Sequence, residues 1–130
     1  MTATVVTATG ITFIVDKMDD TTTGTGAWIG WGTGGSSTGA TATDVDTGLK
    51  AGATEAFGVA TKSQPDAQTN QYVATLTAGT AKTIEEAIVL VGTGTATGTN
   101  KTLIRASHGG QTLATGDSIA YTISMTATSA

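Results

Sequence analysis

The 130-residue sequence contains no cysteine, a single proline and few aromatic side chains. Without cysteine, neither a disulfide framework nor a thiolate metal site can form. No apolar run approaches the ~18 residues that a membrane-spanning helix needs, so we expect no membrane partner. The amino-terminal residues lack a basic segment followed by an apolar core, which predicts no secretory signal and synthesis in the cytoplasm.

Charged residues are also scarce, at 12% of the chain. Six are basic and ten are acidic, which gives a net charge of −4, and Arg105 is the only arginine. Because the lysines are scattered, there is no basic patch that could neutralise phosphate groups. The sequence therefore predicts no direct binding to nucleic acid.

Large apolar side chains are the third shortage, because much of the 38% hydrophobic content is alanine. A chain of this length forms one domain and can bury roughly two-thirds of its unfolded surface. With so few large side chains, the core must be small or must be completed by further copies of the chain. We therefore expect the protein to associate with itself.

Threonine and glycine are abundant instead, at about a quarter and about a seventh of the residues, both above ordinary usage. Threonine is β-branched and favours strands, whereas glycine supplies turns. The composition predicts an all-β fold, a small antiparallel β-sandwich or barrel of short strands with Thr/Gly-rich loops. Residues 1–26 are predicted to form an extended N-terminal arm with a short strand at Ile11–Val15, and residues 27–130 a single β domain.

The segment Ala27–Gly35, AWIGWGTGG, holds both tryptophans. We predict a strand that ends in a tight turn, in which the following glycines adopt positive φ. Residues three apart on a strand fall on opposite faces, so one of Trp28 and Trp31 is expected in the core and the other against a neighbouring subunit. Core or subunit packing is favoured over stacking on a sugar. Together with Ile11 and Phe13 of the arm, the two tryptophans are the candidate interface residues.

Two later segments alternate apolar and polar residues, as half-buried strands do. In Gln71–Ala78 and in Ser118–Met125, every second side chain is expected on the same face of a sheet. The predicted apolar faces consist of Tyr72, Ala74 and Leu76 in the first segment and of Ile119, Tyr121, Ile123 and Met125 in the second.

Shorter strands are predicted around Glu55–Thr61 and at Thr102–Ala106. Turn-forming residues predict turns in SQPDAQTN (Ser63–Asn70), which contains Pro65, at His108–Gly110 and at Thr115–Ser118.

The segment Lys82–Val91, KTIEEAIVLV, is ambiguous. Thr83 and Glu86 stand three apart like a capping box, and the apolar residues partly fit helical spacing. The run is short, however, and rich in β-branched residues between glycine-containing turns. This pattern favours a buried strand, with a single short helix as the alternative.

No motif in the sequence assembles into a site for chemistry. Gly30, Gly32 and Gly35 have the spacing of a dinucleotide-binding loop, but no helical pattern follows them. Asp44–Gly48 has part of the pattern of a calcium loop but lacks its distal glutamate.

The remaining candidates for chemistry are isolated. His108 is the only histidine and is interpreted as a turn residue. Glu85 and Glu86 are adjacent, so on a strand they would point to opposite faces and could not act as a pair. We therefore predict no catalytic, cofactor-binding or metal-binding residue, no cofactor and no enzymatic activity.

The order of several segments resembles that of small virion structural proteins of tailed bacteriophages, most of all capsid decoration (cement) proteins. Such proteins carry a GWGTG segment, a TI-EA segment and a closing strand with a GDSI pattern. One segment departs from the pattern, because Glu86–Val91 lacks the glycine and aspartate found in many of these proteins. The resembling segments are WIGWGTG (Trp28–Gly34), TEAFGVAT (Thr54–Thr61), NQYVATLTAGTAKTIEEAIVL (Asn70–Leu90), LIRAS (Leu103–Ser107) and TGDSIAYTISM (Thr115–Met125).

The resemblance implies a structural protein of the virion, located on the outer capsid surface. Its expected partners are the major capsid protein of the same phage, whose subunits it would bridge, and other copies of itself in a homotrimer. The alternative that the same segments imply is a tail or tail-fibre module, structural or host-binding.

Overall fold

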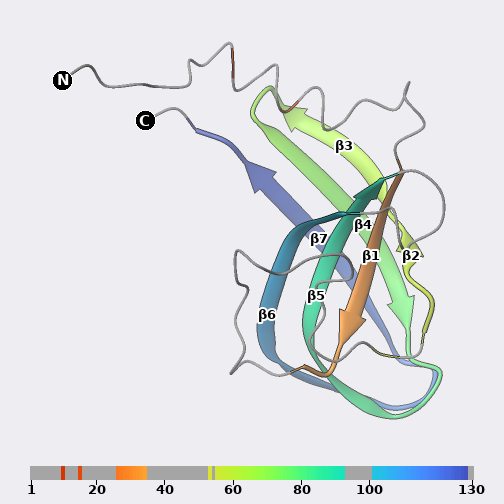
Figure 1. The fold of residues 1–130 in the computed structure, drawn as a ribbon. Coiled ribbons are helices and arrows are strands. Elements are labelled where there is room, and N and C mark those ends of the chain that lie inside the picture. Colours follow the sequence, from red (N-terminus) through yellow and green to blue (C-terminus); the bar gives the residue numbers. More distant parts are fainter. Residues whose placement is uncertain are drawn as a thin grey trace.

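The structure is a computed structural model, and it describes residues 10, 15, 26–34, 53, 55–92 and 101–128. Within these ranges the chain forms seven strands in two antiparallel sheets (Figure 1), which confirms the predicted all-β sandwich. One sheet has the order β2-β1-β5-β6 and the other the order β3-β4-β7. The strands are β1 (Gly26–Gly32), β2 (Gly58–Val59), β3 (Thr61–Asp66), β4 (Thr69–Thr77), β5 (Lys82–Gly92), β6 (Lys101–Leu113) and β7 (Ser118–Thr126).

The chain passes between the two sheets at three short connections. Between β2 and β3 a single residue, Ala60, makes the step, and its N–H donates to the carbonyl of Ala27 at 2.9 Å. The β4–β5 and β6–β7 connections lie beside each other, because the N–H of Gly116 donates to the carbonyl of Ala78 at 2.8 Å. Strands that change sheets in this way hold the two layers of a sandwich in a defined alignment.

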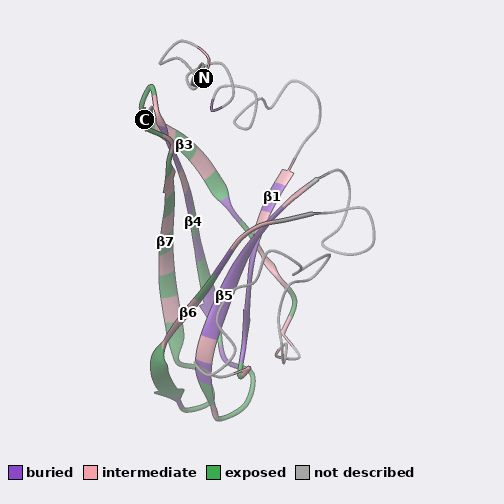
Figure 2. Ribbon diagram, turned by 60° about the vertical axis from the view of Figure 1, so that its left-hand side comes forward, coloured by how far each residue is buried: buried purple, intermediate pink, exposed green. Residues whose placement is uncertain are grey.

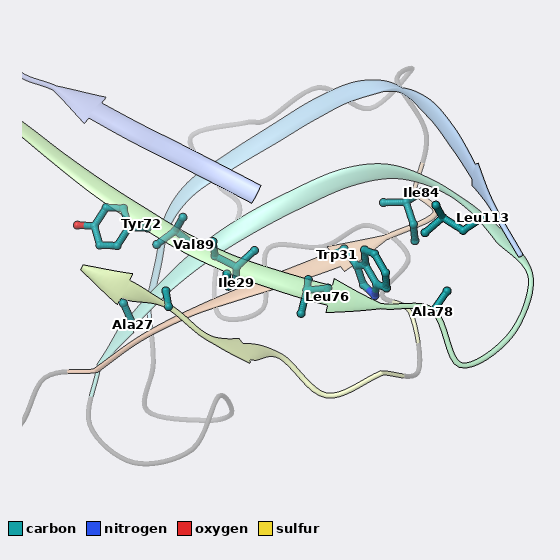
Figure 3. Packing of buried hydrophobic residues seen from close by; sticks show 11 residues of the cluster. Ala27, Ile29, Trp31, Tyr72, Leu76, Ala78, Ile84, Val89 and Leu113 are labelled. Carbon is teal, nitrogen blue, oxygen red and sulfur yellow. The ribbon is translucent and has the colours of Figure 1, made fainter. Parts of the chain in front are cut away.

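The core lies between the two sheets (Figure 3) and is built from the predicted alternation. Tyr72, Ala74 and Leu76 of β4 are buried, while Val73 and Thr75 are exposed, as expected for one inward and one outward face. The inward residues of β7 are each half-buried and alternate with exposed residues along the whole strand (Figure 2). The alternation predicted for both strands is confirmed.

Trp31 is the largest side chain of this core and is 1% exposed. It lies on β1 with Ile29 on the same face, and its ring meets Tyr121 of the opposite sheet edge-on, with centroids 6.5 Å apart. Edge-to-face contacts of this kind stabilise aromatic pairs beyond the area that they bury.

The ambiguous segment forms a strand, as favoured, because β5 lies between β1 and β6 and pairs with both. The pairing with β6 shifts register between Ile84 and Glu86. As a result these two residues do not share a face. Ile84 belongs to the core cluster, whereas Glu86 lies opposite Gly32 on the outer face of the sheet.

Three turn predictions have different outcomes. The turn at Thr115–Ser118 is confirmed, with Gly116 at φ 92° and the N–H of Asp117 donating to the carbonyl of Ala114. The turn predicted in Ser63–Asn70 is confirmed, although Pro65 itself lies in the edge strand β3, at a register irregularity where its missing N–H costs no ladder bond. The turn follows it at residues 67–68, where the carboxylate of Asp66 accepts from the N–H of Gln68.

The predicted turn at His108–Gly110 is wrong, because β6 continues through these residues to Leu113. The three residues occupy an irregular stretch of the strand, where the β5–β6 register shifts. The prediction that glycines turn the chain after Trp31 also fails for Gly32 and Gly34. Gly32 ends β1, and neither glycine has a positive φ. Gly35 lies outside the described residues.

Most of the N-terminal arm lies outside the described residues, including Ile11 and Phe13. Of the predicted strand Ile11–Val15, only Val15 is described. Its backbone is helical rather than extended, and its side chain is fully buried. The carbonyl of Val15 accepts from the side-chain amide of Asn70 at 3.0 Å, at the start of β4. In the part of the chain that the structure describes, no helix is long and apolar enough to cross a membrane.

An ion pair ties the segment before β2 to the β4–β5 connection. The carboxylate of Glu55 contacts the ammonium of Lys82 and accepts from the N–H of Gly79 at 2.8 Å. The hydrogen bond from Lys82 is the main cause that lowers the pKa of Glu55 from 4.5 to about 2.

The lowered pKa predicts an acid-sensitive contribution to stability. A carboxyl whose folded pKa lies below its unfolded pKa stabilises the fold above the unfolded value, and this contribution is lost as the pH falls through the folded value. Glu55→Gln should therefore be less stable than the wild type at neutral pH, and the difference should close between pH 4.5 and about 2. Denaturant unfolding at a series of pH values measures it.

Lys82→Met serves as the control, because it removes the main cause of the shift from the other side. In Lys82→Met the pKa of Glu55 should lie closer to 4.5, so the loss of stability on acidification should span a narrower pH range. A wild-type stability that falls no more steeply than that of Glu55→Gln over this window would contradict the assignment.

Candidate functional site

The two outer faces of the sandwich differ in chemistry. The outer face of the three-stranded sheet carries small hydroxyl side chains, and several of them bond across strands. Thr77 and Ser118 lie 2.7 Å apart and Thr69 and Thr126 2.9 Å apart between their side-chain oxygens. This is the polar face that a solvated antiparallel sheet is expected to have. The outer face of the four-stranded sheet instead carries apolar side chains over β1, β2 and the adjoining part of β5.

The apolar outer face follows from the register of β1 with its neighbours. Trp28 lies opposite Leu90 of β5 and opposite Val59 of β2, and Gly30 lies opposite Ile88. Side chains of directly opposed residues share a face, which is the face opposite to that of Ile29 and Trp31. We call Trp28, Phe57, Val59, Ile88 and Leu90 the Trp28 face.

Two glycines of β1 make room for the aromatic rings of this face. A Cβ on Gly26 would lie 2.7 Å from the ring of Trp28, and a Cβ on Gly30 would lie 2.5 Å from the ring of Phe57. Real side chains do not approach this closely, so both positions require glycine. The glycines of this segment therefore allow close approach of rings within the strand.

Burial within the Trp28 face is graded. Ile88 and Leu90 are 0% and 1% exposed, Trp28 and Phe57 are half-buried, and Val59 is 76% exposed. Val59 is the most exposed large apolar side chain among the described residues. The face thus has a packed centre and an apolar edge that is open to solvent at β2.

A buried ion pair lies on the same outer face. A guanidinium nitrogen of Arg105 is 2.6 Å from a carboxylate oxygen of Glu86, and both side chains are at most 1% exposed. The other carboxylate oxygen of Glu86 accepts from the N–H of Gly34 at 3.1 Å. The pair therefore joins β5 to β6 and holds the chain as it leaves β1.

The ion pair lies away from solvent. Its two opposite charges compensate each other in the interior. Among the described residues, no three histidine, aspartate or glutamate side chains lie close enough to hold a metal ion.

His108 reaches the opposite sheet through the irregular stretch of β6. One of its ring nitrogens lies 3.1 Å from the hydroxyl of Tyr121, and the other lies 2.9 Å from the carbonyl of Gly109. Burial raises the pKa of Tyr121 to about 12. Through this contact with Tyr121, His108 joins the edges of the two sheets.

Of the four candidate interface residues, the structure describes Trp28 and Trp31. Trp28 is half-buried on the outer face, where a partner can reach it, whereas Trp31 belongs to the core and has no surface to offer. The opposite placement of the two tryptophans agrees with the prediction from their spacing. Ile11 and Phe13 lie outside the described residues.

Sequence reasoning did not find Phe57, Val59 or the Glu86–Arg105 pair. Phe57 and Val59 alternate with smaller residues, which signals a strand but not the sheet it joins. Glu86 stands before a run of apolar residues, which is a possible signal of a buried carboxylate. Its partner Arg105 is far away in sequence, and only the β5–β6 register brings the two together.

Comparison of the chain with protein-family models, with curated proteins and with solved structures finds no match. The function must therefore be argued from the chain itself.

Removing one member of the ion pair should be costly. Arg105→Met removes the guanidinium that pairs with the buried carboxylate of Glu86, which should lower the free energy of unfolding by about 3–5 kcal/mol. Urea unfolding followed by tryptophan fluorescence measures this change. The double variant Glu86→Gln/Arg105→Met is the matched comparison and should recover part of the loss, because it carries no buried charge. Equal stability of the wild type and Arg105→Met would contradict the assigned role.

Proposed function

We propose that this protein is a phage capsid decoration (cement) protein that binds the outer face of the head and bridges subunits of the major capsid protein. The observation that carries the proposal is the Trp28 face. A solvated sheet exposes polar side chains, as the three-stranded sheet does, whereas this face ends in Trp28, Phe57 and the 76%-exposed Val59. Exposed apolar surface rimmed by polar residues is typical of sites that bind another protein.

The order of segments that resembles tailed-phage virion proteins supports the same proposal. Both tryptophans and the whole of β1, the strand at the centre of the Trp28 face, lie in or beside the first of these segments. The segment from Asn70 to Leu90 supplies β4 and most of β5. The resemblance therefore covers the strands that build both the core and the proposed binding face.

A cement protein acts by adding contact area between capsid subunits. If it binds the mature lattice more tightly than other states, it stabilises that lattice by mass action. No catalytic step is required, and we propose that the protein is not an enzyme and works at the virion surface without cofactor or nucleic acid. We further propose that it acts as a homotrimer, because a small core favours association of copies.

A tail or tail-fibre module remains the second candidate function. A half-buried tryptophan beside exposed apolar surface also suits recognition of a host-surface glycan, because sugars stack on aromatic rings. The location of the protein in the virion separates the two functions.

The test combines location with binding. Cryo-electron microscopy of the virion should show many copies over the head shell, each contacting more than one capsid subunit. Density confined to the tail or its fibres would overturn the proposal in favour of the second candidate.

A matched pair of variants tests the binding face. Val59→Lys places a charge in the Trp28 face, whereas Val73→Lys places the same charge on the outer face of the three-stranded sheet, where Val73 is 36% exposed. Val59→Lys should weaken binding to undecorated capsids by at least about tenfold, because a charge would be buried in an apolar contact. Val73→Lys should bind as the wild type does. Equal binding of both variants would exclude the Trp28 face as the contact.

A further inference from the structure

The two sheets have four edge strands, and three of them are protected against pairing with another chain. β2 has only two residues. β3 carries Pro65, a register irregularity and the charged Lys62 and Asp66. β6 carries Arg105 and two register shifts. Short length, proline, charge and bulges are the devices by which β-proteins block edge-to-edge association.

The fourth edge, β7, has none of these devices. Its nine residues, SIAYTISMT, include no charge, proline or glycine. They pair with β4 in one continuous register from Thr69↔Thr126 to Thr77↔Ser118. The described strands place a neighbour on one side of β7 only. The backbone groups on its other side therefore form a regular row that can accept a further strand.

We propose that the free edge of β7 pairs with β7 of a second copy of this chain, antiparallel and about a two-fold axis at Thr122. Thr122 is the middle residue of the strand, so this register alone pairs all nine residues. The pairs are Thr122 with itself, Ala120 with Ser124, Ser118 with Thr126, Tyr121 with Ile123 and Ile119 with Met125. The three strands of each copy then form one continuous sheet across the axis.

The side-chain pattern of β7 fits a second copy. In this register every pair joins residues that lie on the same face, so the small polar face continues outward and the apolar face inward. Ile119, Tyr121, Ile123 and Met125 point inward but are only half-buried, and a second strand beside them would cover more of their surface.

Charge also selects a second copy as the occupant. The chain has a net charge of −4, so a contact between copies is least opposed where the surface carries no charge. Among the described edge strands, β7 is the one long strand whose pairing with its own copy places no like charges opposite each other. A two-fold contact of this kind is isologous and closes on itself.

The contact is separate from the Trp28 face, so the inference goes beyond the proposed function and does not depend on capsid binding. It is also compatible with a homotrimer, since a two-fold contact joins whichever assembly already exists to another like it. If the β7 edges pair, the mass of the wild-type assembly should be at least twice that of a variant in which pairing at β7 is blocked.

The experiment is a charge swap at the axis. Thr122→Lys brings two like charges directly opposite each other and should weaken self-association on the order of fivefold, and Thr122→Glu should do the same. An equimolar mixture of the two variants should restore association, because the charges across the axis are then opposite. Sedimentation over a range of concentrations measures the masses, and circular dichroism checks that each variant is folded.

Thr75→Lys and Thr75→Glu are the matched controls. Thr75 is exposed on the same sheet face but lies on the central strand β4, opposite Ala120. Each Thr75 variant should associate as the wild type does, and mixing them should change nothing. If the wild type and Thr122→Lys have the same mass at every concentration, or if the Thr122 mixture fails to associate, self-pairing is overturned.

Amide hydrogen exchange gives a second readout. The β7 amides that do not pair with β4 should become protected as the protein concentration rises. Protection that appears only when capsids are added would identify a strand of the capsid protein as the occupant instead, and it would overturn pairing between copies.

Discussion

The packing of Trp31 between the two sheets is the contact on which the rest of the structure depends. The chain has few large apolar side chains, and this one is fully buried on β1 against Tyr121 of the opposite sheet. Removing a buried tryptophan side chain from a core typically costs about 3–5 kcal/mol, which is a large fraction of the stability of a domain of this size. Without this contact, the remaining core would consist of aliphatic side chains and Tyr72.

The placement of Trp31 also determines which side chains of β1 lie on the outer face of the four-stranded sheet. Since side chains alternate on β1, burying Trp31 and Ile29 turns Trp28 outward. The partners of Trp28 in the neighbouring strands are apolar, and the glycines of β1 leave space for the rings that lie over them. The four-stranded sheet therefore carries apolar side chains on its outer face around Trp28 as well as on its inner face. The other sheet keeps the ordinary division between an apolar inside and a polar outside.

Different parts of the surface therefore differ in chemistry. The Trp28 face is suited to a contact with another protein, and the β7 edge is suited to a contact with a second copy. The hydroxyl-rich face of the three-stranded sheet is left for solvent. The proposed bridging of capsid subunits would use contact surfaces of this kind.

Local patterns in the sequence determined the class of fold and the orientation of several strands. The alternation in β4 and β7, the turn at Gly116 and the opposite placement of the two tryptophans follow from residue spacing and turn chemistry, which act over a few residues. Only the tertiary structure decided the register between strands. It set the position of Glu86 beside Arg105, the continuation of β6 through His108–Gly110 and the role of Gly30 beneath Phe57. These depend on residues that are distant in sequence, and no local pattern specifies which of them will lie opposite each other.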